Sequence, residues 1–572
     1  MSDTEKSKNM QVLPTKKIEL VRPPSGNLKE RMAVGALTIA RQKLLAESSK
    51  FYAVGMYHLH ETDYRQLQAW ANMLGSDVEA VMEHLSELSF SSDRIWDIIL
   101  RIENGHVQAL IWDFDAFEVE NFDFMEGVQI KTLCFLGDCP TGRLYIRLSS
   151  LETLGCDEIQ LAELDLSAVP QLTQLDCSGN QLTELDLTAV PQLTRLDCYD
   201  NQLTRLDLST VPKLTMLECY ANPLTKLDLS AVPLLTYLDC PNNQLTELDL
   251  SAVPQLTSLE CQNNKLTELD LTAVPQLTSL ECYNNQLTEL DLTAVPQLTH
   301  LECYDNQLTE LDLTAVPQLI TLHCSRNCIT ELDLSAVPQL TMFTCSQNRI
   351  AELDLSAVPQ LALLHCSRNS ITELNLSAVP KLAKLNCDKN QHTELDLTAL
   401  PWLTELNCSE NQLMELDLTA LPQLTMLDCS EDPLMGLVQK SKVLACDKNQ
   451  LTKLYCRNNQ LMELDLSVVP KLKVVACDKN QLTKLDLTAV PHLTELNCSE
   501  NQLMELDLTA LPRLTKLGCW NNQLTELDLS AVPQLIELYC GGNQIKELDI
   551  RSLKKLKKLS VDENVHVIGN RP

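Results

Sequence analysis

The chain has 572 residues, which is more than one compact core normally holds, and this predicts several domains or a repeat array. Its formal net charge is −33, and no stretch of the repeats is strongly basic, so binding to a nucleic-acid backbone is disfavoured. The N-terminus has no apolar signal segment, and no window of about 18 apolar residues occurs, so we expect neither conventional secretion nor membrane insertion.

The N-terminal quarter predicts a small domain that precedes the repeats. Residues 1–26 are polar and contain prolines, which predicts a mobile tail. Apolar residues recur at helical spacing over 27–48 and 61–75, and a capping box of Ser76 and Glu79 opens a further helix over 76–88. Another capped helix is predicted over 91–105 and a strand over 109–124. We therefore expect a mainly helical or α+β domain over 27–128.

Three groups in this region carry residues that metals bind. His58, His60 and Glu61 are close in sequence, but a strand places only the two histidines on one face, and no third ligand is evident. Cys134 and Cys139 lack the second pair that a zinc site needs. An acidic cluster could hold a hard cation, although its alternation with Trp112 and Phe114 favours an outward strand face. This cluster consists of Asp113, Asp115, Glu118, Glu120 and Asp123. We expect no metal, cofactor or catalytic site.

A 21-residue repeat follows. Residues 266–286 and 287–307 differ only where Ser279 becomes His300 and Asn284 becomes Asp305. Each unit follows the pattern Leu-x-x-Leu-x-Cys-x-x-Asn-x-Leu, and twenty of the 23 cysteines lie in this row, including Cys446. Alternation about Leu280 and Cys282 is strand periodicity, so both side chains should point inward. Parallel stacking of such strands buries a stripe of Leu and Cys that no single unit could bury alone.

The cysteine row is expected to be reduced. Neighbours in a parallel stack lie about 4.8 Å apart with parallel Cα–Cβ bonds, whereas a disulfide requires converging Cβ atoms about 3.8 Å apart. The sulfurs would be collinear rather than tetrahedral, which disfavours a ladder of metal ions. Buried, reduced thiols favour a cytoplasmic location.

The other rows of the repeat also have structural explanations. The asparagine row, which includes Asn222 and Asn285, can satisfy backbone groups where the chain leaves the strand. The "LTELDL" segment has the spacing of a second strand, and "TAVP" that of a turn. Its repeated Glu and Asp account for much of the charge as a solvated face. With no helix on the outer side, the array should curve only gently.

This pattern resembles the leucine-rich repeat family, and the 21-residue unit with Cys at the third consensus Leu position is similar to the internalin J type of bacterial surface protein. The resemblance covers roughly residues 130–565 and implies a mostly β leucine-rich repeat solenoid of parallel stacked short strands. It is nearly silent on the ligand. Internalins carry a secretion signal and usually a wall anchor, neither of which is seen here, so their extracellular location does not transfer.

The predicted boundaries follow the repeat. We expect a capping segment over 129–155, the array over 156–545, and a C-terminal cap over 546–572 that begins near the basic run at 554–558. The cysteine spacing falls to 17 and then 10 residues between Cys429 and Cys456, beside a block that recurs almost verbatim. An imperfectly joined duplication explains this spacing and predicts an irregular coil near 430–456.

What varies is the outward face of the cysteine strand. The residue before Cys is acidic from Asp176 to Glu302, and tyrosines follow several of the cysteines. Aromatic and Arg side chains on a constant scaffold are typical anchors of binding surfaces. Neutral drift is the alternative, although the "ELD" face varies less than drift would require. The candidate partner-binding residues are Tyr199, Tyr220, Tyr237, Tyr283, Tyr304, His300, His323, Arg326, His365, Arg368 and Trp520.

The sequence favours a non-enzymatic scaffold that recognises a protein partner. The alternative is a translocated bacterial effector, delivered to a host cell without a conventional signal peptide, whose N-terminal domain acts on a target that the repeats select. An acidic DNA mimic is a weaker third possibility. Partner identity, organism and oligomeric state stay open.

Overall fold

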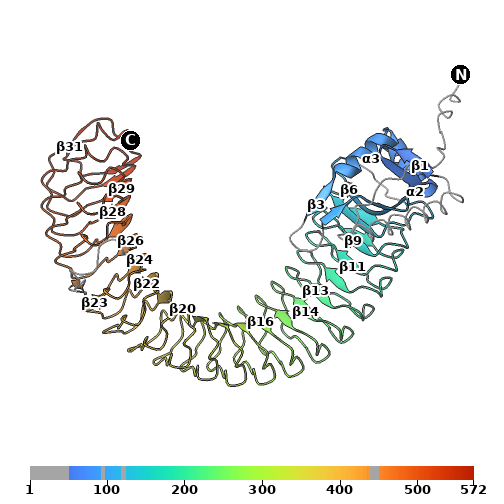
Figure 1. The fold of residues 1–572 in the computed structure, drawn as a ribbon, viewed down its shortest axis with the longest axis horizontal. Coiled ribbons are helices and arrows are strands. Elements are labelled where there is room, and N and C mark those ends of the chain that lie inside the picture. Colours follow the sequence, from blue (N-terminus) through green and yellow to red (C-terminus); the bar gives the residue numbers. More distant parts are fainter. Residues whose placement is uncertain (1–50, 92–96, 117–123, 435, 439–449) are drawn as a thin grey trace, which may run out of the picture. The chain divides into compact units, whose positions relative to one another are not determined.

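The computed structural model of the chain describes residues 51–91, 97–116, 124–434, 436–438 and 450–572 (Figure 1). The chain divides into two compact units, which comprise residues 1–266 and residues 267–572. The expected tail over 1–26 and helix over 27–48 lie outside the described residues. None of the described helices is long and apolar enough to cross a membrane.

The first described elements are a hairpin and two helices. Strands β1 (Phe51–Val54) and β2 (Tyr57–His60) pair antiparallel, and α2 (Glu61–Met73) and α3 (Val78–Glu87) follow. The helices confirm the expectations for 61–75 and 76–88. The expected cap is one residue off, because the Asp77 carboxylate, and not Ser76, accepts the bond from the Ala80 backbone N–H at 2.8 Å.

The helix expected over 91–105 is wrong. The chain forms β3 (Ser89–Ser91) and β4 (Asp97–Ile99), which pair antiparallel, and then β5 (Arg101–Glu103), which pairs antiparallel with β6 (His106–Asp113). Asn104 and Gly105 have φ of 55° and 82°, the left-handed values that an Asn-Gly hairpin turn requires. The Asn-Gly dipeptide is itself a sequence signal for a hairpin, but the helical spacing of the apolar residues led to the prediction of a helix. The described part of 51–128 is an α+β arrangement, and a mainly helical domain is not confirmed.

Strand β6 opens the parallel stack of the first unit. It confirms the first half of the strand expected over 109–124, while 117–123 lie outside the described residues. Seven further strands follow β6 in this stack, and each pairs in parallel with the strand before it. These strands are β7 (Thr132–Leu136), β9 (Thr153–Gly155), β11 (Gln174–Asp176), β12 (Arg195–Asp197), β13 (Met216–Glu218), β14 (Tyr237–Asp239) and β15 (Ser258–Glu260).

The second unit repeats this arrangement. Its main strands are β16 (Ser279–Glu281), β17 (His300–Glu302), β18 (Thr321–His323), β19 (Met342–Thr344), β20 (Leu363–His365), β21 (Lys384–Asn386), β22 (Glu405–Asn407), β24 (Met426–Asp428), β26 (Lys453–Tyr455), β27 (Val474–Ala476), β28 (Glu495–Asn497), β29 (Lys516–Gly518), β30 (Glu537–Tyr539) and β32 (Lys558–Ser560). Each pairs in parallel with the next.

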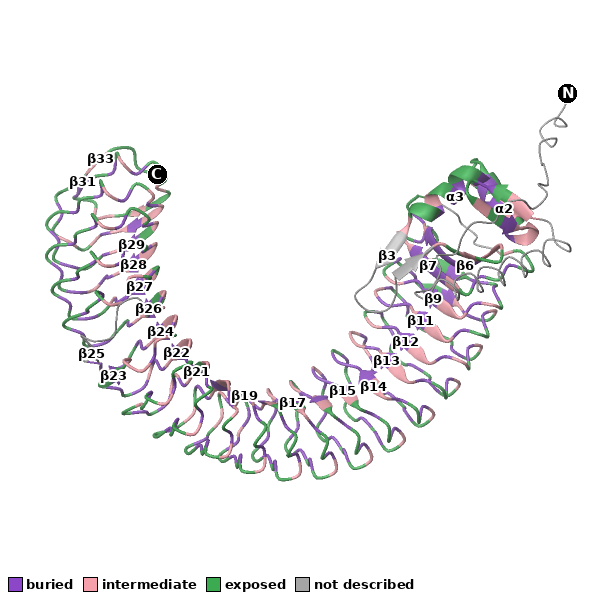
Figure 2. Cartoon of the chain, in the orientation of Figure 1, coloured by how far each residue is buried: buried purple, intermediate pink, exposed green. Residues whose placement is uncertain are grey.

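The expected strand faces are confirmed. Leu280 and Cys282 are fully buried, whereas Ser279, Glu281 and Tyr283 are partly exposed. The same alternation recurs in most strands of both units (Figure 2), although Asp197, Asp239 and Ala476 are buried at the position before the ladder cysteine. The stacked coils therefore share a continuous core of Leu, Val and Cys side chains that excludes water.

No disulfide links the cysteines of the described residues. Burial raises the pKa of the Cys324 and Cys366 thiols to about 12, so they stay protonated and unreactive at neutral pH. They therefore pack as small apolar groups.

We expect the native protein to react slowly with a thiol reagent and the denatured, non-reduced protein to release nearly all 23 thiols. The core cysteines react only after unfolding because they are buried and protonated. The measurement is a colorimetric thiol count before and after adding denaturant. A count near zero in denaturant would mean that the ladder is oxidised.

The asparagine row forms a second ladder, which confirms its expected backbone role. Asn222 is 4% exposed, and its Oδ1 accepts from the Leu203 backbone N–H at 2.9 Å. Its Nδ2 donates to the backbone carbonyls of Cys198 at 3.0 Å, Cys219 at 3.2 Å and Tyr220 at 3.2 Å. Each asparagine thus satisfies backbone groups in two adjacent coils where the chain turns out of the strand.

The second strand expected in "LTELDL" does not form in most coils. In such a coil Asp186 Oδ1 accepts from the Thr188 backbone N–H at 2.9 Å, and hydrogen bonds from the Thr188 hydroxyl and backbone amide lower the pKa of Asp186. Asp165 and Asp417 accept the same backbone bond in coils that do form the strand, so this turn accompanies both arrangements. The strands outside the main stack pair as β8 (Arg143–Tyr145) with β10 (Glu163–Asp165), β23 (Glu415–Asp417) with β25 (Gly436–Val438), and β31 (Glu547–Asp549) with β33 (His566–Ile568).

The irregular coil predicted near 430–456 is described only in part, because residues 435 and 439–449 lie outside the described residues. β24 pairs directly with β26, so Met426 lies beside Lys453. The main stack therefore passes from Cys429 to Cys456, and Cys446 lies outside the described residues. Asp432 takes the place of the ladder asparagine in this coil, since its Oδ1 accepts from the Leu413 backbone N–H at 3.0 Å.

Each coil also holds one left-handed residue, two positions after its ladder cysteine. Asp200 has φ of 50°, Arg326 of 56° and Arg368 of 56°, and glycine occupies the position at Gly179 and Gly542. This conformation turns the backbone N–H toward the next coil; that of Asp200 donates to the Tyr220 carbonyl at 2.9 Å. The hydrogen bond to the next coil therefore offsets the free-energy cost that a positive φ has for a non-glycine residue.

Candidate protein-binding face

The outward positions of the main strands form one surface in each unit, which we call the strand face. It comprises three positions per coil: the first strand residue, the residue before the ladder cysteine and the residue after it. All of the predicted partner-binding residues except Arg326 and Arg368 occupy these positions. Those two arginines are exposed at the left-handed position immediately beside it.

The strand face of the first unit carries a row of carboxylates in register, and Arg195 is its main counter-ion. Arg195 donates from Nε to Asp197 Oδ2 at 2.8 Å and from Nη2 to Glu218 Oε1 at 2.9 Å. Burial and the nearby Glu218 carboxylate raise the pKa of Asp197 to about 7, although Arg195 opposes them. The row consists of Asp176, Asp197, Glu218, Asp239 and Glu260.

Tyrosines flank this row. The rings of Tyr199 and Tyr220 stack with centroids 4.2 Å apart and an interplanar angle of 7°. Tyr237 donates from its hydroxyl to Glu260 Oε1 at 3.0 Å, and burial together with that carboxylate raises the pKa of Tyr237. The structure thus brings Tyr199 and Tyr220 together and holds Tyr237 against the acidic row.

In the second unit, Tyr283, Tyr304 and His323 form a continuous stack. The centroids of Tyr283 and Tyr304 lie 4.2 Å apart, and those of Tyr304 and His323 lie 4.1 Å apart. Burial and, secondarily, His365 lower the pKa of His323 to about 4, so this ring is neutral at pH 7. The stack is a partly exposed, rigid aromatic surface.

The remaining predicted residues of this patch are more dispersed. His300 is exposed, and its Nδ1 lies 2.9 Å from Thr299 Oγ1. Arg326 forms an ion pair of 3.2 Å with Asp305. Burial and then the Lys384 ammonium lower the pKa of His365. His323 and His365 are therefore largely neutral, and Arg326 and Arg368 contribute positive charge to the patch.

Trp520 lies in a groove of about 570 Å³ that the sequence did not predict. Gly518 lines the groove at the position before the ladder cysteine, where most other coils have a side chain. A Cβ at this position would lie 2.7 Å from Asn497 Oδ1. That glycine was the available signal. The lining also includes Lys453, Tyr455, Arg457, Val474, Ala476, Glu495, Lys516, Glu537 and Tyr539.

The sequence candidates of the N-terminal part separate in the structure. His58 is exposed on β2, and Glu61 pairs with Arg65 at 2.6 Å. Asp113, partly exposed between buried Trp112 and Phe114, and Asp115, which is exposed, point outward as expected, and the other acids of that cluster lie outside the described residues. Cys134 is buried on β7, and the Cys139 thiol donates to the Arg143 carbonyl at 3.6 Å.

No protein-family model and no curated protein matches the chain. Among solved structures, it is similar to the functional domain of InlJ from Listeria monocytogenes, which includes a cysteine ladder. The identity is 35%, 64% of this chain and 70% of that chain are covered, and the TM-score is 0.46. YopM from Yersinia enterocolitica is 29% identical over 73% of this chain and 86% of that chain, with a TM-score of 0.57.

The leucine-rich repeat ectodomain of the Arabidopsis receptor kinase HAESA shares the fold alone. It is 20% identical over 76% of this chain and 82% of that chain, with a TM-score of 0.59. The 21-residue consensus, the parallel stack and the two ladders agree with these matches. The chain belongs to the leucine-rich repeat proteins, in the variety that carries a cysteine ladder, and resembles the internalin J type.

Proposed function

We propose that the chain is a protein-binding scaffold whose strand face holds a partner. The observation that carries this proposal is the stack of Tyr283, Tyr304 and His323 on an otherwise constant scaffold. Stacked rings lose little conformational entropy on binding and offer large apolar surfaces with polar edges. Duplication alone copies Tyr283 into Tyr304, but it does not account for His323, which replaces the glutamate of the preceding units and extends the stack.

The charge of the face indicates which partner suits the first unit. Its carboxylates stand one strand apart, and of the charged side chains on strands β11–β15 only Arg195 is basic. A partner segment with lysine or arginine side chains would relieve this repulsion and could also pack its cations against Tyr199 and Tyr220. The proposed partner therefore presents a basic segment to residues 174–266.

Fold neighbours provide a precedent for such use. The HAESA ectodomain is in complex with a peptide hormone ligand, and that of GASSHO1 is in complex with CASPARIAN STRIP INTEGRITY FACTOR 2. The cysteines of the described residues are unbridged, which favours a reducing compartment, so we propose the cytoplasm or, for the effector alternative, the interior of a host cell.

The test is a double substitution, Tyr283→Ala with Tyr304→Ala. Its expected effect is a loss of affinity of roughly 2 kcal/mol, about 30-fold. The wild-type chain first captures its partner, the partner is then purified, and binding is measured at low and high salt. The matched control is Glu268→Lys with Glu289→Lys, two exposed residues of the outer face, which should leave affinity nearly intact.

The two alternatives give different results. A DNA mimic binds through summed carboxylates, so the Glu-to-Lys pair would weaken it more than the tyrosine pair. An effector would retain capture when its N-terminal domain is altered but would lose its action on the target. Loss of capture only with the Glu-to-Lys pair would rule out the strand face as the partner site.

A further inference from the structure

Three metal-binding side chains from three elements meet in the N-terminal part. His60 ends β2, Asp63 lies in the first turn of α2, and His106 begins β6. One potential ligand atom from each lies within 4.8 Å of the other two, and the imidazole centroids are 4.5 Å apart. The sequence showed no further metal-binding side chain near His60. The structure brings His106, 46 residues further along the chain, beside it.

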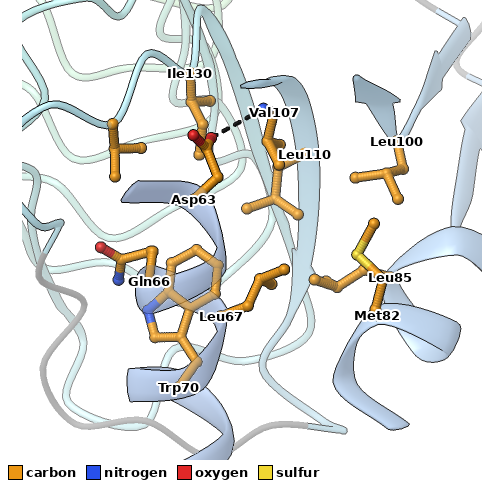
Figure 3. A pocket seen from close by; sticks show the side chains of 11 residues that line it. Asp63, Gln66, Leu67, Trp70, Met82, Leu85, Leu100, Val107, Leu110 and Ile130 are labelled. Atoms are coloured by element: carbon orange, nitrogen blue, oxygen red, sulfur yellow. Dashed lines mark hydrogen bonds between the residues drawn. The ribbon is translucent and has the colours of Figure 1, made fainter. Parts of the chain in front are cut away.

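Asp63 is the fixed point of this cluster. Its side chain is 1% exposed, and Oδ1 accepts from the Val107 backbone N–H at 2.9 Å, as Figure 3 shows. Leu67, Leu110 and Ile130 line the same interior pocket, whose residual volume is only about 10 Å³. A carboxylate in such apolar surroundings is stable only when donors saturate it, so Asp63 cannot move far.

Both imidazoles connect to this one carboxylate through Nδ1. His106 Nδ1 lies 2.8 Å from Asp63 Oδ2. His60 Nδ1 lies 2.9 Å from Thr62 Oγ1, which donates to the same Asp63 Oδ2 at 3.1 Å. Because the Thr62 hydroxyl donates to Asp63, His60 Nδ1–H donates to Thr62 Oγ1; the Thr62 backbone N–H lies 3.4 Å from the same Nδ1, a contact that would be a hydrogen bond only in the other tautomer. With both Nδ1 atoms engaged, the remaining donor atom of each ring is Nε2.

Neither Nε2 atom has a hydrogen-bond partner within the described part of the chain, and both rings are partly exposed. A histidine that binds a metal through Nε2 usually gives its Nδ1 proton to a carboxylate or another acceptor, which fixes the ring and raises its basicity. His106 has this arrangement directly, and His60 has it through the Thr62 hydroxyl.

We propose that His60 and His106 bind one divalent transition-metal ion through their Nε2 atoms, with Asp63 and Thr62 positioning the rings and water completing the coordination. Zinc bonds to nitrogen of about 2.0–2.1 Å place two ligand atoms about 3.4 Å apart. The two imidazole rings already lie side by side, with centroids 4.5 Å apart. The ion would tie the β1–β2 hairpin and α2 to the first strand of the parallel stack.

The test uses Co²⁺ added to the reduced, metal-free, full-length chain. Cobalt distinguishes this site from the many thiols, because nitrogen and oxygen ligands give weak visible bands without the intense near-ultraviolet thiolate band. We expect one equivalent of Co²⁺ at micromolar concentration with the nitrogen and oxygen spectrum. Excess Zn²⁺ should displace it and raise the midpoint of thermal unfolding.

Four variants locate the site. His106→Gln and His60→Asn should each weaken Co²⁺ binding at least tenfold, and His60→Asn retains a residue that caps helices well. Thr62→Val should weaken binding through loss of the His60 support, without changing the number of ligands. His58→Gln, an exposed histidine on the same strand, is the control and should bind as wild type. Circular dichroism without metal verifies folding.

Three outcomes would overturn the proposal: no cobalt binding by the folded wild type, a thiolate spectrum for the bound ion, or full binding by folded His106→Gln. If His106→Gln fails to fold, His60→Asn and Thr62→Val decide between the proposed site and another. Equal binding by those two variants and wild type would mean that the ion lies elsewhere.

Discussion

Replacing Asn222 by alanine should destabilise its coil and the adjacent coil by roughly 3–4 kcal/mol, because the Leu203 amide and three backbone carbonyls lose their partner. The groups are buried, so water cannot replace the side chain without opening the coil. Since each coil of a repeat array contacts only its neighbours, the loss should stay local.

Hydrogen exchange at the Leu203 amide and in the flanking coils measures this effect in the intact protein. The matched control is Gln202→Ala, because Gln202 is exposed in the coil that contains Leu203 and should change local stability by less than about 0.5 kcal/mol. Similar exchange rates in the two variants would contradict a structural role for the asparagine ladder.

Replacing Asp432 by asparagine should stabilise the protein by about 2–4 kcal/mol at pH 8 and by much less at pH 5. Burial raises the pKa of Asp432 to about 7, opposed by hydrogen bonds from the Leu413 and Asn411 amides and assisted by Asp428 and Glu410. Its Oδ2 is buried with no hydrogen-bond partner in the described residues. An asparagine amide could donate there, as Asn411 does to two cysteine carbonyls.

The direction follows from proton linkage. The folded pKa of about 7 exceeds the ordinary aspartate pKa of 3.8 that applies in the unfolded chain, so the native state holds this proton more tightly. The contribution of Asp432 is therefore complete below pH 4 and is lost as pH rises to about 7. Asparagine does not titrate, so the Asp432→Asn protein does not lose stability at this position as the pH rises.

Urea unfolding of both proteins between pH 5 and pH 8 tests this prediction. The control is Asp465→Asn, because hydrogen bonds from Ser467 lower the pKa of that exposed residue, and its replacement should give no gain that grows with pH. A pH-independent difference between wild type and Asp432→Asn would show that Asp432 is ionised throughout.

The repeats made much of the fold predictable. Alternation about Leu280 and Cys282 predicted the strand and its two faces, and identical spacing predicted the in-register stack. A local pattern that recurs in every unit specifies contacts between units, because equivalent residues become neighbours. "LTELDL" misled because its spacing alone does not decide whether a strand forms: the same Asp turn occurs with the strand at Asp165 and without it at Asp186.

The non-repetitive part was harder to predict because its contacts join residues that are distant in sequence. His60 and His106 meet only because β5 and β6 turn back at Asn104 and Gly105, where a helix was expected. The groove around Trp520 depends on a missing side chain at Gly518. The aromatic candidates could be listed from the sequence, but the stacking of Tyr304 on His323 required the register.

The left-handed position in each coil makes the array adjustable one unit at a time. A non-glycine residue there carries a backbone cost of about 1 kcal/mol, which glycine would remove. Glycine occupies it only near the two ends of the described array, at Gly179 and Gly542, while Asp, Ala, Arg, Gln, Lys, Glu and Asn occur between. Because distant coils act independently, such increments add. Glycine substitutions at this position could therefore raise the stability of a chosen stretch in small increments without altering a core residue. Each substitution removes only one side chain, at the left-handed position.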